Sequence, residues 1–185
     1  MQAIGYDLYC KMLHEAVSEA KGGQAVEDKF NTSVDISTDA FIPATYIANE
    51  YQKLDIYKRI AGIETVDESE EMLEELIDRF GEPPKSVQNL LRIAQIKAKA
   101  HSLFIKDIIQ KNDELKLVMF ERAVIDPLKI PELIGVYSPL LSFNMDENNP
   151  YFVFKIKGNS RIKNADILEI LTDLLEHMEI LKENS

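Results

Sequence analysis

The chain has 185 residues, of which 45% are hydrophobic and 29% charged, as is ordinary for a soluble globular protein. Its 32 acidic and 21 basic side chains give a formal net charge of −11. This charge disfavours sequence-independent binding to nucleic acid and favours a partner rich in arginine and lysine. The single cysteine, Cys10, excludes an internal disulfide framework and a thiolate zinc site. No apolar run reaches the roughly 20 residues that cross a bilayer, and no secretory signal opens the chain, so we expect a cytoplasmic protein.

The N-terminal part is predicted to be a helix followed by a linker and an extended segment. Apolar residues recur at three-to-four spacing over 4–21, and Gly22 begins the stop signal that ends this helix. The polar stretch 22–31 is the best candidate for a linker. Alternating apolar residues around Val34 then predict an extended segment over 33–43.

Three helices are predicted in the middle of the chain. The first spans 50–63 and is capped by Asn49. The second is opened by the capping box of Thr65 and Glu68 and is ended by Gly81. A pair of prolines then starts the third helix, which spans about 84–103.

The second half of the chain changes to a period of two. The predicted elements are a strand over 115–120, a short helix over 127–137, a hairpin over 139–157 and a final amphipathic helix over 164–182. Helices and antiparallel strands are segregated along the chain. The sequence therefore predicts an α+β fold, with helices packed on a small antiparallel sheet and an N-terminal linking helix.

Sequence motifs for catalysis and cofactor binding are absent. The chain has no phosphate-binding loop and no dinucleotide fingerprint, and its histidines lie on three different predicted helices. Cys10 and His14 have the spacing of a thiolate–imidazole pair, but no third orienting group accompanies them. We predict no catalytic residue, no metal and no cofactor.

Charge is segregated onto two consecutive predicted helices. Between Glu64 and Glu82 there are nine acids and one base, Arg79, whereas 85–106 holds five bases and no acid. One interpretation is a pair of helices whose charges cancel across their seam. The other is a surface for an arginine-rich partner, because four acids at three-to-four spacing share one face. These four acids are Glu71, Glu74, Glu75 and Asp78.

Several ordered segments resemble the C-terminal domain of the bacterial transcription-repair coupling factors, the Mfd family with its TRCF domain. The segments are Val34-Asp35-Ile36, Asp39-Ala40-Phe41-Ile42-Pro43, Leu54-Asp55-Ile56-Tyr57-Lys58-Arg59-Ile60-Ala61, Glu75-Leu76-Ile77-Asp78-Arg79-Phe80-Gly81 and Leu90-Leu91-Arg92-Ile93-Ala94. Upstream, 5–13 is similar to the segment that leads out of the motor lobes in that family. The resemblance thus implies a linking helix at 1–23 and a regulatory C-terminal domain at 24–185.

The resemblance also implies a function without catalysis in this region. The family consists of ATP-dependent DNA translocases that act on stalled RNA polymerase and recruit the repair protein UvrA. Its C-terminal domain docks on an N-terminal UvrB-like module, masks the UvrA-binding surface and restrains the motor. The acidic family positions of that contact match Glu75 and Asp78, with Glu71 and Glu74 beside them. Arg79 is expected to pair within the fold or to lie over an aromatic ring.

Two other functions fit parts of the sequence. The basic helix predicted over 85–106 could form a nucleic-acid-binding accessory module, but it lacks aromatic residues for base stacking through most of its length, and the net charge opposes it. A small hydrolase could use paired carboxylates such as Glu74 and Asp78, although such pairs occur in any acidic helix. We therefore expect no direct nucleic-acid binding and no membrane association.

Overall fold

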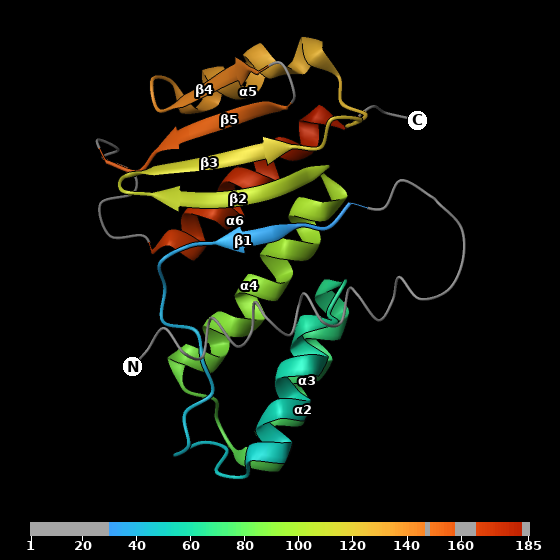
Figure 1. Cartoon of the computed structure of the whole chain (residues 1–185), viewed down its shortest axis with the longest axis vertical. Coiled ribbons are helices and arrows are strands. Elements are labelled where there is room, and N and C mark those ends of the chain that lie inside the picture. Colours follow the sequence, from blue (N-terminus) through green and yellow to red (C-terminus); the bar gives the residue numbers. More distant parts are fainter. Residues whose placement is uncertain (1–29, 147–148, 158–165, 183–185) are drawn as a thin grey trace. The chain divides into compact units, whose positions relative to one another are not determined.

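The computed structural model describes residues 30–146, 149–157 and 166–182 (Figure 1). Within these ranges the chain forms two compact units, one made of 38–98 and the other of 30–37 with the residues from 99 onwards. Helices and a five-stranded sheet confirm the α+β class. The predicted linking helix and the Cys10–His14 pair lie outside the described residues, and the boundary at 23 stays a prediction.

The first unit is built from three helices, α2 (Glu50–Ala61), α3 (Val66–Phe80) and the greater part of α4 (Lys85–Ser102). The side chain of Asn49 caps α2 as expected, because its oxygen accepts hydrogen bonds from the backbone N–H groups of Tyr51 and Gln52, each at 3.0 Å. The three helices begin and end within two residues of the bounds predicted from their caps and apolar periodicity. The basic helix predicted over 85–106 is too long, however, because α4 ends at Ser102 and Lys106 lies on the strand that begins at Ile105.

The ends of α3 are fixed by local signals in the sequence. Thr65 Oγ1 accepts from the backbone N–H of Glu68 at 3.2 Å, as a capping box requires. The Glu68 carboxylate accepts from the N–H of Glu64, at 2.7 Å, one residue before the position expected. At the other end Gly81 adopts φ 83° and ψ −172°, a conformation almost restricted to glycine, so the helix stops there.

A loop before α2 is tied to helices α2 and α4 of the first unit. The buried hydroxyl of Tyr57 accepts from the N–H of Ile42 at 2.7 Å, and Asn89 of α4 donates to the Asp39 carbonyl at 2.8 Å. Between these polar contacts lies an apolar core. Its buried members include Ile47, Ile56, Tyr57, Ile60, Met72, Leu76, Val87, Leu90, Ile93 and Ala94.

The second unit contains a sheet of five strands in the order β1-β2-β3-β5-β4. The strands are β1 (Ser33–Asp35), β2 (Ile105–Lys111), β3 (Glu114–Met119), β4 (Leu141–Met145) and β5 (Pro150–Lys155). Four of the strands are antiparallel, as predicted, whereas the short β1 runs parallel to β2. The sheet is therefore mixed, because β1 joins β2 after the three helices of the first unit instead of through a tight turn.

One face of this sheet is apolar and is covered by α6 (Ile167–His177), which lies behind the strands in Figure 1. The strand register places Val34, Ile108, Leu117, Phe152 and Phe143 in one row across the sheet. The buried leucines of α6 and of α5 (Ile130–Tyr137) complete this core, together with the short turns η1 (Pro127–Lys129) and η2 (Met178–Leu181). The single predicted helix over 164–182 is thus α6 followed by a 3₁₀ turn.

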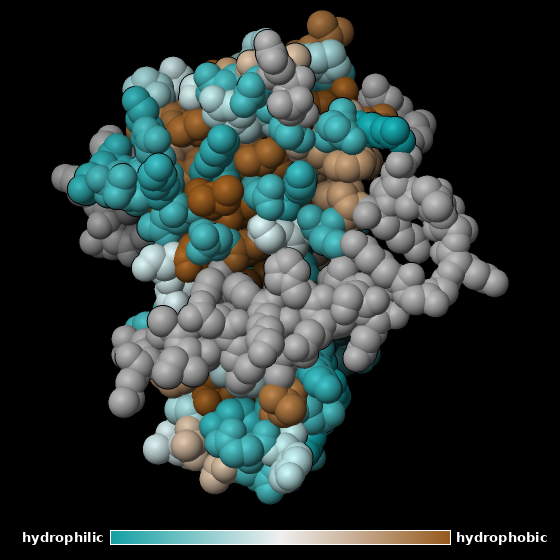
Figure 2. Space-filling view, in the orientation of Figure 1, coloured by the Kyte–Doolittle hydropathy of each residue, from teal (hydrophilic) through white to brown (hydrophobic). Residues whose placement is uncertain are grey.

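The opposite face of the sheet is open to solvent. Figure 2 shows hydrophobic side chains at its centre, surrounded by hydrophilic ones. The register places Ile109, Lys116 and Val153 side by side on this face, all of them half-buried or exposed. The ammonium group of Lys116 also lies 4.2 Å from the centre of the Tyr151 ring.

Candidate functional site

The outward surface of α3 carries a row of acidic side chains at spacings of four, three and four residues. This acidic row consists of Asp67, Glu71, Glu74 and Asp78, and all four residues are exposed. The buried residues of α3, such as Met72 and Leu76, lie on the opposite side of the helix. Within the described part of the chain, no side chain of the row makes a hydrogen bond or ion pair. The row therefore presents four uncompensated negative charges to solvent.

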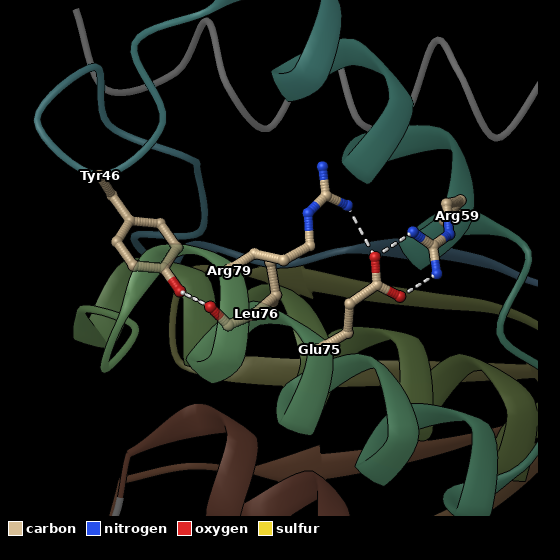
Figure 3. A network of polar contacts seen from close by, with 5 residues as sticks. All are labelled: Tyr46, Arg59, Glu75, Leu76 and Arg79. Carbon is tan, nitrogen blue, oxygen red and sulfur yellow. Dashed lines mark hydrogen bonds and ion pairs between the residues drawn. The ribbon is translucent and has the colours of Figure 1, made fainter.

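Glu75 lies beside the acidic row on α3 and, unlike its members, is paired. Figure 3 shows its carboxylate between two guanidinium groups, Arg59 of α2 and Arg79 of α3 itself. Arg59 donates through Nη1 to Oε1 at 2.6 Å and through Nη2 to Oε2, while Arg79 Nη1 donates to Oε1 at 2.7 Å. Both oxygens of the carboxylate are thus occupied by arginines of the same unit.

These contacts stabilise the ionised form of Glu75. Hydrogen bonds from Arg59 and then from Arg79 lower the pKa of the Glu75 carboxyl from 4.5 to about 2. The same bond raises the pKa of Arg59. The sequence groups Glu75 with Glu71, Glu74 and Asp78 on one face. The structure distinguishes Glu75 from these neighbours, because it is half-buried and paired and joins α3 to α2. Whether any of the four contacts a partner stays a prediction.

The C-terminal end of α3 is held by aromatic and carbonyl contacts. The guanidinium of Arg79 lies 4.9 Å from the centre of the Phe80 ring, so Arg79 both pairs within the fold and lies over a ring, as expected. The Tyr46 hydroxyl is within reach of two carbonyl oxygens, that of Gly81 at 2.8 Å and that of Leu76 at 3.1 Å. Burial, followed by the charge of Glu82, raises the pKa of Tyr46, so this hydroxyl stays a donor. Sequence reasoning missed this contact, since Tyr46 precedes α3 by twenty residues.

The bases of 85–106 do not neutralise the acidic row. Lys99 pairs with Glu179 of η2 in the second unit, and Lys85, Arg92 and Lys97 each have interactions of their own. Among the described residues none of these bases forms an ion pair with α3. The charges of the acidic row are therefore not cancelled by described bases of α4. The only polar side-chain contact described between these two helices joins Gln95 to Ser69 at 2.9 Å.

Among the described residues, the acidic row does not form an enclosed catalytic site. Glu74 and Asp78 lie on the outward surface of α3, exposed to water, without the enclosure in which a hydrolase activates its carboxylates. The described ranges hold no group of three side chains suited to a metal ion. They also contain no helix that is both long enough and apolar enough to traverse a lipid bilayer.

Comparison with known proteins shows similarity to transcription-repair-coupling factors. The family described as the TRCF domain matches residues 36–130, about half of the chain. The transcription-repair-coupling factor of Bacillus subtilis (strain 168) is 37% identical over 162 residues, which cover 86% of this chain. The protein of the same name from Staphylococcus aureus (strain USA300) is 43% identical over 111 residues, or 58% of this chain.

A solved structure agrees with these sequence relationships. The crystal structure of the C-terminal domain of a transcription-repair coupling factor superposes with a TM-score of 0.69 and 28% sequence identity. The match covers 84% of this chain and 94% of that one. By contrast, the matched region spans only 14% and 10% of the two relatives from Bacillus subtilis and Staphylococcus aureus.

Proposed function

Since this chain belongs to the TRCF domain family, we propose that it is the regulatory C-terminal domain of a transcription-repair coupling factor. In this role the domain docks on the N-terminal UvrB-like module of the same polypeptide. The docked domain masks the surface that UvrA binds and restrains the DNA-translocating motor. The domain itself makes and breaks no covalent bond.

The observation that carries this proposal is the exposed and unpaired acidic row of α3. A partner surface of arginine and lysine gains charge-assisted hydrogen bonds from carboxylates that have no side-chain partner among the described residues. Each well-formed bond of this kind contributes roughly 1.5–3 kcal/mol. A few such bonds hold a domain in place and still allow release, because exposed ion pairs weaken with salt and with competing partners.

In this proposal Glu75 has a structural role: it holds the helix that carries the acidic row. Its bonds to Arg59 and Arg79 join α2 to α3 and fix the orientation in which α3 presents the acidic row. A direct contact between Glu75 and the UvrB-like module requires an incoming arginine to share or replace one of these two partners. We therefore assign the direct contacts with the UvrB-like module to Glu71, Glu74 and Asp78. Glu75 contacts the module only if an arginine of the module shares or replaces Arg59 or Arg79.

Binding of this chain to the isolated UvrB-like module of its own factor tests the proposal. Calorimetry compares the wild type with the variant Glu74→Lys/Asp78→Lys, which reverses two charges of the row without touching the Glu75 cluster. The matched control is Glu114→Lys/Glu121→Lys, which changes the net charge equally at exposed positions of the second unit.

We expect the α3 variant to bind at least about a hundredfold more weakly, because two charge-assisted contacts become repulsive. The control keeps most of its affinity. Equal losses in the two variants would mean that only net charge matters, and unchanged binding in the α3 variant would refute docking through this row.

A further inference from the structure

The C-terminal end of α3 is closed by a single backbone hydrogen bond. The N–H of Gly81 donates to the Ile77 carbonyl at 3.0 Å. In the fuller closure that many helices use, the N–H of the residue after the glycine also returns to the helix. The N–H of Glu82 makes no such bond among the described residues, and the next two residues are prolines, which have no N–H. The last carbonyl groups of α3 therefore need a donor from elsewhere in the chain.

The last turn of α3 also carries acidic side chains where a helix favours basic ones. The C-terminal end of a helix has a partial negative charge, which repels carboxylates. Asp78 lies three residues before Gly81 and Glu82 follows it, whereas Arg79 is the base of this turn. The turn that presents Asp78 is thus opposed by the electrostatic field of its own helix.

Tyr46 supplies the donor that this end of the helix needs. Its hydroxyl lies 2.8 Å from the Gly81 carbonyl oxygen and 3.1 Å from that of Leu76, the contact drawn in Figure 3. The Tyr46 ring also packs against Phe80, with 5.9 Å between the ring centres. One side chain therefore provides both a hydrogen bond and an apolar contact to the last turn of α3.

The position of Tyr46 is fixed by the loop that carries it. The N–H groups of Tyr46 and Ile47 both donate to the Pro43 carbonyl, at 3.0 and 3.1 Å. Ile47 is only 1% exposed, so the loop is anchored in the core directly beside the tyrosine. The hydroxyl consequently reaches α3 from an immobilised segment, and little further ordering is needed to form its bond.

We propose that Tyr46 is a positioning residue for the acidic row, because it holds the last turn of α3 in helical form against the charges of Asp78 and Glu82. Without its hydroxyl and ring the turn opens more often, and Asp78 leaves the line that it forms with Glu71 and Glu74. The inference rests on the proposed docking function for the role of Asp78, but the capping of α3 by Tyr46 is tested without it.

Amide hydrogen exchange of the complete chain, followed by NMR, tests the capping. Tyr46→Phe removes the donor and keeps the ring, whereas Tyr46→Ala removes both. The N–H of Gly81 is expected to exchange about three- to tenfold faster in Tyr46→Phe, and more than about tenfold faster in Tyr46→Ala. Tyr151→Phe is the control, since the Tyr151 hydroxyl makes no hydrogen bond within the described ranges and belongs to the second unit. Unchanged exchange of Gly81 in both Tyr46 variants overturns the inference.

Calorimetry with the isolated UvrB-like module tests the positioning. The apparent affinity falls with the fraction of chains in which the last turn is formed. Tyr46→Phe is therefore expected to weaken binding about twofold, Tyr46→Ala about fivefold, and Tyr151→Phe not at all. When Asp78→Asn is already present, Tyr46→Ala should weaken binding by less than about twofold, because no charge remains at position 78 to be placed.

The outcomes separate this inference from the docking function. A loss of global stability alone leaves binding unchanged as long as the chain stays folded, so the affinity reports the position of the row. If Gly81 exchanges faster but the module binds the wild type and both Tyr46 variants equally, the positioning role is overturned and docking stands. If the module does not bind the wild type, docking fails and the positioning role fails with it, while the exchange rates still decide whether Tyr46 caps α3.

Discussion

Replacing Glu75 with glutamine tests the structural role that we assign to this residue. The substitution keeps the size of the side chain but removes the charge that Arg59 and Arg79 share. A pKa held at about 2 instead of 4.5 corresponds to about 3 kcal/mol of interaction with the ionised form. The side chains of Glu75 and Arg59 are 31% and 41% exposed, however, so solvent screening reduces this contribution. We expect Glu75→Gln to lower the free energy of unfolding by about 1–1.5 kcal/mol at pH 7.

The effect should depend on pH with a defined sign. Because folding lowers the pKa of Glu75, its stabilising contribution is complete above the unfolded value of 4.5 and is lost as the pH falls towards 2. The difference between wild type and Glu75→Gln should therefore shrink to less than about half by pH 3. Urea unfolding followed by circular dichroism at several pH values measures this difference. Glu74→Gln, in the unpaired acidic row, is the control and should change stability little.

Two results would contradict this reasoning. Equal stability of wild type and Glu75→Gln at pH 7 would mean that the three hydrogen bonds contribute nothing measurable. A difference that persists unchanged from pH 7 to pH 3 would mean that the loss comes from packing and not from charge.

Three further substitutions probe the fold that presents the surface, each measured by urea unfolding. Tyr57→Phe leaves the buried N–H of Ile42 without its acceptor and should cost about 1–3 kcal/mol; a neutral effect would show that this amide finds another acceptor. Gly81→Ala places a Cβ in open space but at φ 83°, so backbone strain alone should cost about 1–3 kcal/mol, and an unchanged midpoint would refute that strain. Leu76→Ala removes a fully buried side chain of α3 and should cost about 2–5 kcal/mol, whereas Leu128→Ala at an exposed position should stay within about 0.5 kcal/mol. Similar losses in the two leucine variants would contradict the assignment of the core.

The helices of the first unit could be predicted because their signals are local. Asn49, Thr65 and Gly81 act on backbone groups within four residues of themselves, and the structure uses each of them as the sequence indicates. The pairing of Arg79 with Glu75 is also local, since the two lie one helical turn apart.

The missed features depend on contacts between distant residues. The sequence does not reveal β2, because a shift in its register between Ile105 and Asp107 interrupts the alternation that marks a strand. The parallel pairing of β1 with β2 joins residues 74 positions apart, such as Ser33 and Asp107, and no local signal encodes it. In the same way, Arg59 contacts Glu75 only because α2 and α3 pack together. The sequence alone therefore does not show that Glu75 is paired while the neighbouring acids are not.

Competition with UvrA tests the central claim most directly. The claim predicts that this chain, added in trans to the isolated UvrB-like module, lowers the apparent affinity of UvrA for that module in proportion to its own occupancy. The variant Glu74→Lys/Asp78→Lys should then leave UvrA binding unaffected. Simultaneous binding of UvrA and this chain to the module, with neither weakening the other, would contradict the masking role.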